Sequence, residues 1–368
     1  MLKVLEVNVD DHLYGGVYVL VKNIIANLPS DIKADIAALE PFDDNRHINE
    51  LELYGSKVYY VGSKRNKILK QLDIYKNIKR IVEMNDYDVV HFHSDVSHKI
   101  LVSALASKKR AKKLIFHSHA SDAEGGHLFV RRLFHRICCL FLKKIPATYI
   151  ATSLESGEWM FPWAGDKVII LDNGVDYQRY KYNSKVRNEK RNELAIEDEE
   201  FLIGLFGRFV PAKNPMYSLK ILKSLIQLDK HIKLLCIGDG PLKNEYVKKI
   251  IDEGLERYVK FISNTDRIED YYQAIDALIM PSNFEGFGLV AVESQISGTP
   301  TLVSENVPKK TKISSLIHYL PIQDTSLKQW CKLLDESKKY IKYDVIDEIE
   351  QKYELCNVVN KLVKIYKG

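Results

Sequence analysis

Short apolar runs alternate with longer amphipathic stretches along almost the whole chain. The runs are rich in Val, Ile and Leu, as strands buried on both faces are. The stretches between them space apolar residues three and four positions apart, which predicts helices. Strands that alternate with helices indicate parallel sheets with right-handed crossovers. The predicted strands cover residues 2–9, 34–39, 57–61, 88–93, 113–119, 148–152 and 168–171, and then 201–206, 232–237, 259–262, 277–280 and 301–303.

The alternation falls into two parts that a polar segment separates. Residues 172–176 are rich in turn formers, and residues 177–200 are polar and charged. A length of 368 residues suits two domains that each bury their own core. We therefore predict two α/β domains with Rossmann-like, doubly wound parallel sheets, over residues 1–174 and 175–349. Ligands of such sheets bind outside the carboxyl ends of the strands, so two domains facing each other would share one deep cleft.

Composition limits the class of protein. With 46% hydrophobic and 28% charged residues, the chain is typical of a soluble globular protein. Its longest apolar run, residues 137–142, is far too short to cross a bilayer. The first residues predict a strand and lack the features of a signal peptide, and the five cysteines show no paired metal spacing. We therefore expect a cytoplasmic protein.

Two glutamates eight positions apart, Glu285 and Glu293, form the most informative motif. The segment between them begins as a glycine-containing turn and continues as an apolar helix. Because it follows a predicted strand, the free N–H groups at the start of the helix would form a cradle for an anion or a polyol. Both carboxylates would face the same crevice. Such a pair suits hydroxyl-rich ligands, since each carboxylate accepts two hydrogen bonds.

Two cations precede this motif. Arg208 follows the strand at 201–206, and Lys213 opens the next helix. Arginine donates two parallel hydrogen bonds to phosphate oxygens, and lysine adds a compact charge. A lysine at a helix N-terminus is unfavourable against the helix dipole unless an anion binds there. Together the two cations would neutralise a diphosphate whose charge grows as its bond to a sugar breaks.

Glycines follow two other strands. Gly15 and Gly16 let the backbone approach a ligand closely, but they are not part of a G-x-G-x-x-G fingerprint, which argues against a nicotinamide dehydrogenase. Gly238 begins a turn that fits a nucleotide-contacting loop and a plain strand-to-helix turn equally well. The backbone at Ile262, at the end of the next strand, is our candidate for contact with a base.

Four histidines end two consecutive strands, His91 and His93 on one and His117 and His119 on the next. Alternation places His117 and His119 on one face of the sheet. No Asp, Glu or Cys shares their spacing, so we predict no metal site. No D-x-D pair stands at a strand end either, and we expect no requirement for a divalent cation.

In combination these motifs resemble retaining glycosyltransferases of the GT-B fold, in the family 4 or group 1 type that includes bacterial capsule and exopolysaccharide enzymes. The resemblance covers nearly the whole chain. It implies two Rossmann-like domains that face each other across a cleft, with the C-terminal helix within 350–368 packed on the N-terminal domain. The residues that carry it are Gly15-Gly16, Gly207-Arg208 with Lys213-Asn214, Gly238-Asp239-Gly240-Pro241, and Glu285 with Glu293.

The resemblance also implies a role for each site residue. Arg208 and Lys213 would hold the donor diphosphate. Glu293 would bind the ribose hydroxyls and Glu285 the sugar hydroxyls, while His119 would contact the sugar near the reacting carbon. The backbone N–H groups that would complete the cradle belong to Phe287, Gly288 and Leu289.

The implied function is the transfer of a hexose from a UDP-sugar to a lipid-linked oligosaccharide in capsular or exopolysaccharide biosynthesis. Neither a cofactor nor a metal is expected. Two alternatives stay open at this point. A UDP-sugar epimerase on the same scaffold would consume donor without an acceptor. A non-catalytic sugar-nucleotide-binding subunit would bind donor without turnover.

Basic charge is concentrated in the first half of the chain. The whole chain carries +5, whereas residues 99–144 hold eleven basic and two acidic residues, a net charge of +9. Each basic residue near anionic lipid contributes about 1 kcal/mol. The pattern over residues 129–142 also fits a buried helix with a solvated basic edge. We predict peripheral contact with an anionic membrane, at the inner face of the plasma membrane, and no nucleic-acid partner.

Overall fold

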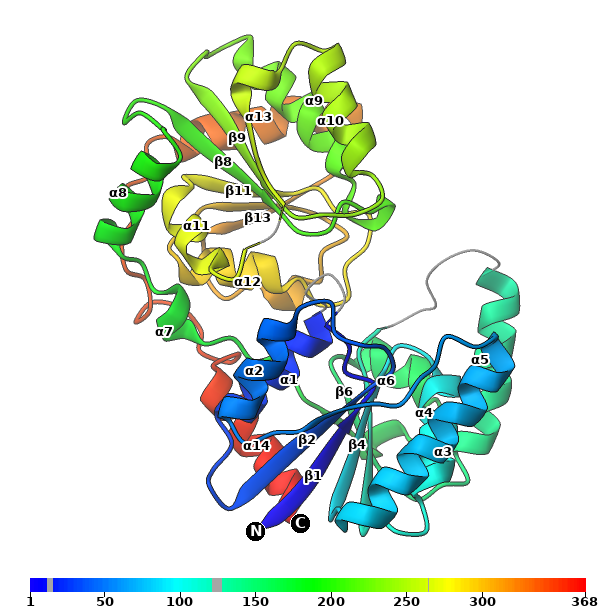
Figure 1. Ribbon diagram of the computed structural model, residues 1–368. Coiled ribbons are helices and arrows are strands. Elements are labelled where there is room, and N and C mark those ends of the chain that lie inside the picture. The colour runs from blue at the N-terminus through cyan, green and yellow to red at the C-terminus, as the bar shows by residue number, and fades with distance from the viewer. Residues whose placement is uncertain (12–15, 121–127, 264) are drawn as a thin grey trace. The chain divides into compact units, whose positions relative to one another are not determined.

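The protein divides into two compact units, each described here by itself. Unit 1 consists of Met1–Gly174 and Leu355–Gly368, and unit 2 consists of Val175–Glu354. In each unit a parallel sheet lies between two layers of helices (Figure 1). This is the doubly wound α/β class that the alternation of strands and helices predicted. The computed structural model describes residues 1–11, 16–120, 128–263 and 265–368.

Unit 1 has a seven-stranded sheet among its described residues, in the order β3-β2-β1-β4-β5-β6-β7. All neighbouring strands are parallel. The predicted strand boundaries agree with the observed ones to within two residues. The strands are β1 (Leu2–Val7), β2 (Ile32–Ala38), β3 (Val58–Tyr60), β4 (Val89–Ser94), β5 (Lys113–Ser118), β6 (Thr148–Ala151) and β7 (Val168–Ile170).

Helices cover both faces of this sheet because successive strand side chains point to opposite faces. Val4 packs with α1 (Gly16–Ala26) and α14 (Leu355–Lys367) on one face. Leu5 packs on the other face with α3 (Lys67–Asn85) and α4 (Ser97–Ser107). Among the described residues, the remaining helices of this unit are α2 (Asn45–Leu53), α5 (Leu128–Leu142), α6 (Leu154–Met160) and η2 (Gly165–Lys167).

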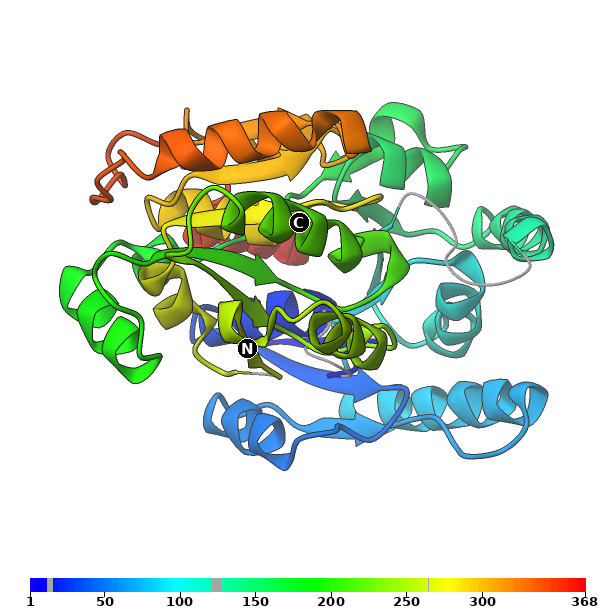
Figure 2. The same cartoon turned by 90° about the horizontal axis from the view of Figure 1, so that it is seen from above.

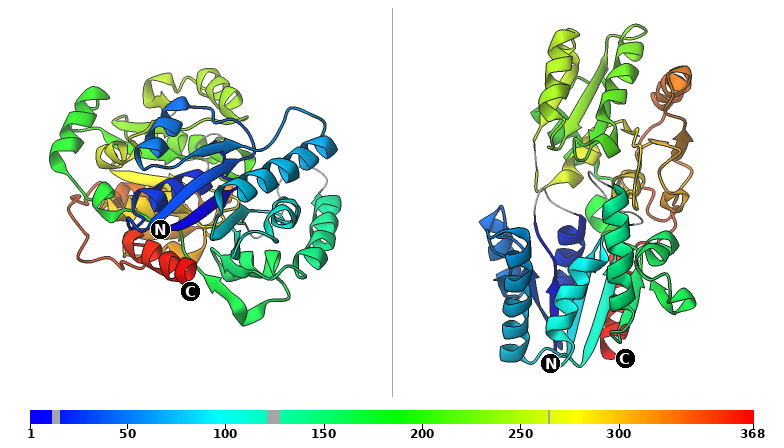
Figure 3. Two further views of the ribbon diagram at one scale, coloured as in Figure 1. Left: turned by 60° about the horizontal axis from the view of Figure 1, so that its bottom comes forward. Right: turned by 90° about the vertical axis from the view of Figure 1, so that its right-hand side faces the viewer.

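The C-terminal helix α14 packs beside α1 in unit 1. Its buried face includes Val358, Val359 and Leu362, which join the core under β1 and β2. The two chain termini therefore lie at the same end of unit 1 (Figure 3). Near that terminus, Tyr366 is also buried and reaches the sheet.

Unit 2 has a six-stranded parallel sheet among its described residues, in the order β10-β9-β8-β11-β12-β13. The sequence did not predict β13, an edge strand whose Ile317-His318-Tyr319-Leu320 mixes buried and exposed positions. The other strands were predicted. They are β8 (Phe201–Phe206), β9 (Ile232–Ile237), β10 (Val259–Ile262), β11 (Ala277–Met280) and β12 (Thr301–Ser304), whereas the unpredicted β13 spans Ile317–Leu320.

Two apolar clusters cover the faces of the unit 2 sheet. One contains side chains from α9 (Pro215–Ile226), α10 (Lys243–Asp252) and α13 (Leu327–Ser337). The other contains side chains from α7 (Tyr177–Tyr180), α11 (Ile268–Ala274) and α12 (Leu289–Ile296). The remaining helical elements of unit 2 are α8 (Ser184–Glu193), η3 (Pro211–Lys213), η4 (Glu256–Tyr258), η5 (Lys309–Thr311) and η6 (Asp324–Ser326).

The described helices include no candidate transmembrane span. Each is either too short or too polar to cross a bilayer.

Candidate functional site

A pocket in unit 2 lies at the carboxyl ends of β8 and β11. These two strands are neighbours, with β9 and β10 on the β8 side and β12 and β13 on the β11 side. The strand order therefore reverses between them, which is where doubly wound sheets bind ligands. The pocket is lined by residues 205–209, Lys213, Pro215 and residues 280–282.

An ion pair between Lys213 and Glu285 stands beside this pocket. The Ser282 hydroxyl donates a second hydrogen bond to the same oxygen of Glu285, at 2.9 Å. The Glu285 side chain is 5% exposed and that of Lys213 is 33% exposed, so solvent reaches the cation but hardly the carboxylate. The cationic and anionic halves of the predicted site are thus brought together across 72 residues of sequence.

Backbone hydrogen bonds hold the two partners of this pair in place. The N–H groups of Asn283 and Phe284 both donate to the carbonyl of Ala212, at 2.7 and 3.1 Å. The Asn283 amide adds a hydrogen bond to the carbonyl of Pro211, at 2.9 Å. The loop after β11 is therefore tied to the turn that carries Lys213. Sequence reasoning missed Ser282 and Asn283, and the only available signal was their position just after a strand.

Arg208 lines the same pocket, immediately after β8. Its side chain is exposed, and its guanidinium makes no hydrogen bond or ion pair with the described residues. A cation next to an already neutralised Lys213–Glu285 pair leaves one net positive charge at the pocket. That charge is available to an anionic ligand.

Glu293 has different partners from Glu285. It projects from α12 and accepts hydrogen bonds from Tyr272 at 2.7 Å and Tyr180 at 3.0 Å. Burial raises the pKa of Glu293, and the two phenol donors oppose this shift. No hydrogen bond among the described residues joins Glu293 to Glu285, so the structure groups Glu285 with Lys213 and places Glu293 with two tyrosines that sequence reasoning missed.

One predicted glycine, Gly238, has a clear packing role. A Cβ on Gly238 would lie 2.0 Å from the Gly207 carbonyl oxygen, and Gly238 has φ +144°. Only glycine allows the loops after β8 and β9 to touch there. The Gly238 N–H donates to the Ile262 carbonyl at 3.0 Å, which extends the sheet by one bond. Packing is thus sufficient to explain the glycine at 238.

The segment Phe287, Gly288 and Leu289 forms the start of α12. Gly288 precedes the helix with φ +92°. The Phe287 ring is buried against the Tyr353 ring, with centroids 5.0 Å apart, and the Lys310 ammonium lies 4.8 Å from its centroid. The side chain of Phe287 therefore holds the loop in place by packing. A ligand at this segment would contact the backbone N–H groups and not the Phe287 ring.

The predicted site residues of unit 1 belong to different segments with different local environments. Gly15 lies outside the described residues, and Gly16 is the exposed first residue of α1. His119 directly follows β5 and is partly exposed. Its N–H donates to the Ser94 carbonyl at 3.2 Å, which holds it beside the end of β4.

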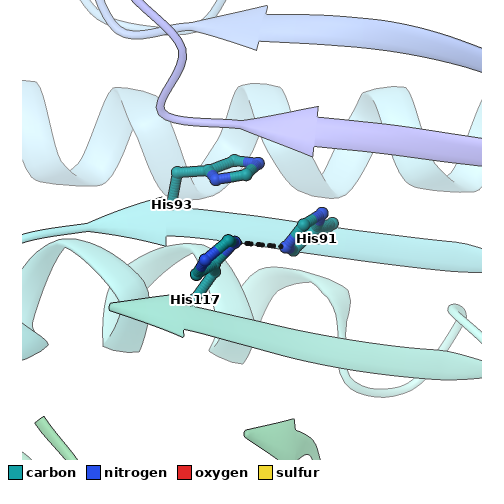
Figure 4. Close-up of side chains that lie close together, drawn as sticks. All are labelled: His91, His93 and His117. Carbon is teal, nitrogen blue, oxygen red and sulfur yellow. Dashed lines mark hydrogen bonds between the residues drawn. The ribbon is translucent and has the colours of Figure 1, made fainter. Parts of the chain in front are cut away.

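The histidines of β4 and β5 form one buried cluster with Glu6. Nitrogens of His91, His93 and His117 all lie within 4.8 Å of one another, and His91 hydrogen-bonds His117 (Figure 4). Glu6 of β1 accepts from His93 at 2.8 Å. Sequence reasoning found no carboxylate with matching spacing because Glu6 comes from a distant strand that is the sheet neighbour of β4.

The chain matches known proteins over both units. Residues 14–179 match the model of Glycosyltransferase Family 4, and residues 186–313 match that of Glycosyl transferases group 1. It is 25% identical over 302 residues to the putative glycosyltransferase EpsF of Bacillus subtilis, covering 80% of this chain and 77% of that one.

Two further similarities extend this result. The chain is 24% identical over 247 residues, 64% of its length and 62% of the other, to the Escherichia coli UDP-Gal:alpha-D-GlcNAc-diphosphoundecaprenol alpha-1,3-galactosyltransferase. Its fold resembles that of Anabaena Alr3699/HepE, solved in complex with UDP and glucose, with a TM-score of 0.80, 19% identity and 100% of both chains covered.

Proposed function

We propose a specific reaction for this chain, which belongs to the GT-B glycosyltransferases of the family 4 and group 1 type. The reaction is the transfer of a hexose from a UDP-sugar to a lipid-linked oligosaccharide, with retention of the anomeric configuration. The product would serve capsular or exopolysaccharide assembly, and the protein would work at the cytoplasmic face of the membrane.

The observation that carries this proposal is the charge arrangement at the switch point of unit 2. Arg208 and the Lys213–Glu285 pair meet there at the carboxyl ends of β8 and β11. A diphosphate could bind Arg208 and Lys213, while Glu285 accepts hydrogen bonds from the attached sugar. Because these two cations supply the positive charge, the proposal includes no divalent cation.

Retention follows if the leaving diphosphate acts on the same face as the attacking hydroxyl. As the bond from the anomeric carbon to the diphosphate oxygen breaks, negative charge grows on that oxygen. It accepts the proton of the acceptor hydroxyl, whose oxygen bonds to the anomeric carbon from the same side. Arg208 and Lys213 would stabilise the developing charge, which lowers the barrier more than it tightens ground-state binding.

The names of similar proteins support the choice of substrates. The Escherichia coli relative is named for a UDP-Gal donor and a diphosphoundecaprenol acceptor. Anabaena HepE was solved with UDP and glucose. By analogy, we assign a UDP-hexose and a lipid-linked acceptor to this chain.

A UDP-sugar should raise the thermal unfolding midpoint of the protein more than a GDP- or ADP-sugar at equal concentration. At 100 times its Kd a ligand adds about 2.7 kcal/mol to the free energy of unfolding. For a protein of this size that corresponds to a shift of several degrees. Differential scanning fluorimetry with the three nucleotide series measures it, and equal shifts from all three would contradict a UDP donor.

The products then separate the reaction classes. With UDP-hexose and a diphosphoundecaprenol-linked sugar, we expect a longer lipid-linked glycan in EDTA-containing buffer, with the donor's anomeric configuration by NMR. A changed UDP-sugar formed without acceptor would instead identify an epimerase. Binding without any product would identify a non-catalytic subunit.

We further assign the predicted membrane contact to α5. This helix lies at an outer edge of unit 1 beside α4 (Figure 2). Only one side of it is buried, through His135, Cys138, Cys139 and Leu142. The structure thus contradicts the alternative of a largely buried helix. The exposed apolar side chains are Leu128, Phe129, Val130, Leu133, Phe134, Ile137, Leu140 and Phe141.

Arginines interleave with this exposed apolar surface, at Arg131, Arg132 and Arg136. A helix with exposed Phe and Leu beside basic residues suits the interface of an anionic membrane. The apolar rings would enter the headgroup layer while the guanidinium groups bind phosphates. This position would bring the enzyme to a lipid-linked acceptor.

The double variant Arg131→Glu/Arg136→Glu should bind anionic vesicles at least about tenfold more weakly, since each cation near the surface contributes about 1 kcal/mol. Co-sedimentation with vesicles of phosphatidylglycerol and phosphatidylcholine measures the change. Lys248→Glu/Lys249→Glu, on the exposed side of α10, makes the same change in net charge and should have little effect. Equal losses of vesicle binding in both double variants would show that binding depends on the net charge of the protein and not on α5.

A further inference from the structure

The buried cluster of unit 1 contains a hydrogen-bond chain that ends at His119. It begins at Glu6, which accepts from the Tyr366 hydroxyl at 2.6 Å and from His93 Nε2 at 2.8 Å. His93 Nδ1 then lies 2.9 Å from His119 Nε2. Glu6, His93 and Tyr366 are all almost completely buried, whereas His119 is partly exposed. The hydrogen-bond chain thus runs from the interior of unit 1 to the end of β5.

The carboxylate of Glu6 determines the position of each proton along this hydrogen-bond chain. An ionised carboxylate only accepts hydrogen bonds, so His93 must carry its proton on Nε2. The Nδ1 of neutral His93 is then an acceptor. His119 must therefore donate from Nε2, which leaves Nδ1 of His119 as a lone pair without a partner among the described residues.

A second branch from Glu6 ends inside the protein. His91 Nδ1 lies 2.9 Å from both the Tyr366 hydroxyl and the Glu6 carboxylate, so it donates. His91 Nε2 then accepts from His117 Nδ1 at 3.2 Å. The remaining nitrogen of His117, Nε2, is buried and has no partner among the residues the structure describes. This branch does not include His119.

The ionisation states required by this scheme agree with the electrostatic surroundings. Burial lowers the pKa of His93 to about 4. Burial and the neighbouring histidines hold the pKa values of His117 and His119 well below the ordinary histidine range. Burial opposes ionisation of Glu6, but His91 and His93 outweigh it and lower its pKa. An ionised Glu6 and neutral rings at His93, His117 and His119 are therefore expected at neutral pH.

We propose that Glu6 and His93 are positioning residues that hold His119 in a single tautomer, with Nδ1 as a hydrogen-bond acceptor for a ligand hydroxyl. This inference rests on the proposed function in one respect, the contact between His119 and the donor sugar. It specifies the partner chemistry: the sugar group facing His119 donates a hydrogen bond. A hydroxyl can do so, but fluorine at the same position cannot.

The same cluster has the nitrogen spacing of a metal site, and the two readings exclude each other. With the proton positions derived above, the lone pairs that His91 and His93 can offer a metal ion are those of His91 Nε2 and His93 Nδ1. Those lone pairs accept the protons of His117 and His119 in the scheme above. Metal content therefore tests the proposal directly. Stoichiometric zinc retained after dialysis, measured by mass spectrometry, would overturn it.

Nitrogen NMR of the full chain labelled with ¹⁵N-histidine reads the tautomers without any turnover. We expect His119, identified by its loss in His119→Gln, to show a protonated Nε2 and an unprotonated Nδ1 from pH 6 to pH 8. A protonated Nδ1, or a rapid mixture of both forms, would overturn the proposal. Because this measurement needs no substrate, its outcome is independent of whether the chain transfers sugar.

Three variants connect the tautomer to activity. His93→Gln keeps a donor for Glu6 but removes the acceptor for His119, so kcat/KM should fall about tenfold, the effect of one lost hydrogen bond. His93→Asn places an oxygen near the former Nδ1 and should recover most of the loss. His117→Asn perturbs only the second branch and should leave kcat/KM within about twofold.

The pattern of these activities decides the outcome. Equal losses in His93→Gln, His93→Asn and His117→Asn, with a common fall in unfolding midpoint, would indicate a purely structural cluster. If the unmodified protein transfers no sugar but its His119 has the expected tautomer, the proposed function fails and the positioning of His119 stands.

Discussion

Replacing Arg208 with alanine should lower kcat and kcat/KM together, by about 10²–10³-fold. Arg208 is an exposed cation at the carboxyl end of β8 that makes no ion pair with the described residues. Its charge is thus available for the diphosphate. The stabilisation by Arg208 would be greatest in the transition state, where negative charge develops on the leaving diphosphate. Steady-state kinetics with UDP-hexose as varied substrate measure both constants.

The control for this variant is Lys249→Ala, which removes an exposed cation from α10. We expect its activity to stay close to that of the unmodified protein. The activity of Arg208→Lys should lie between those of Arg208→Ala and Lys249→Ala, because lysine keeps the charge but loses the two parallel hydrogen bonds. Near-normal turnover of Arg208→Ala would remove Arg208 from the mechanism.

Glu285→Gln should separate sugar recognition from nucleotide binding. The substitution removes the ion pair with Lys213 and weakens the acceptor proposed for sugar hydroxyls. We expect kcat to fall about 10²-fold, in line with the loss of one group that acts in the transition state. The affinity for UDP alone should stay equal or rise, since Lys213 is freed and a negative charge is lost. Calorimetric titration with UDP and with the UDP-sugar compares the two.

Ser282→Ala is the matched variant for this test. It deletes one hydrogen bond to Glu285 while keeping the carboxylate and its ion pair. The loss of a single hydrogen bond, about 1 kcal/mol, should reduce activity only severalfold. If Glu285→Gln weakened the binding of UDP and of the UDP-sugar by the same factor, Glu285 would not be the residue that recognises the sugar.

The strands were predictable because their signal is local. A buried parallel strand needs a continuous apolar run, and runs such as those of β8 and β9 are evident without any tertiary information. The edge strand β13 was missed for the same reason. Its outer positions contact solvent, so His318 and Tyr319 interrupt the run. The final helix was expected within 350–368 and is observed at Leu355–Lys367.

The candidate site was predictable where its residues are close in sequence or directly follow a strand. Glu285, Phe287 and Gly288 occupy one loop, and Arg208 follows a strand whose end is clear. Their partners were not predictable. Ser282, Tyr180 and Tyr272 are ordinary residue types with no distinctive spacing. Which hydroxyl reaches which carboxylate depends on side-chain packing.

By itself the sequence determined the α/β class, the order of strands and helices, and the residue types at the strand ends, because each depends on neighbours a few positions away. Only the tertiary structure decided which of those residues meet. Lys213 reaches Glu285 across 72 positions, and His93 reaches Glu6 across 87. The order of strands in a sheet sets such pairings, since it brings side chains from distant segments to one edge. Local patterns contain no information on that order.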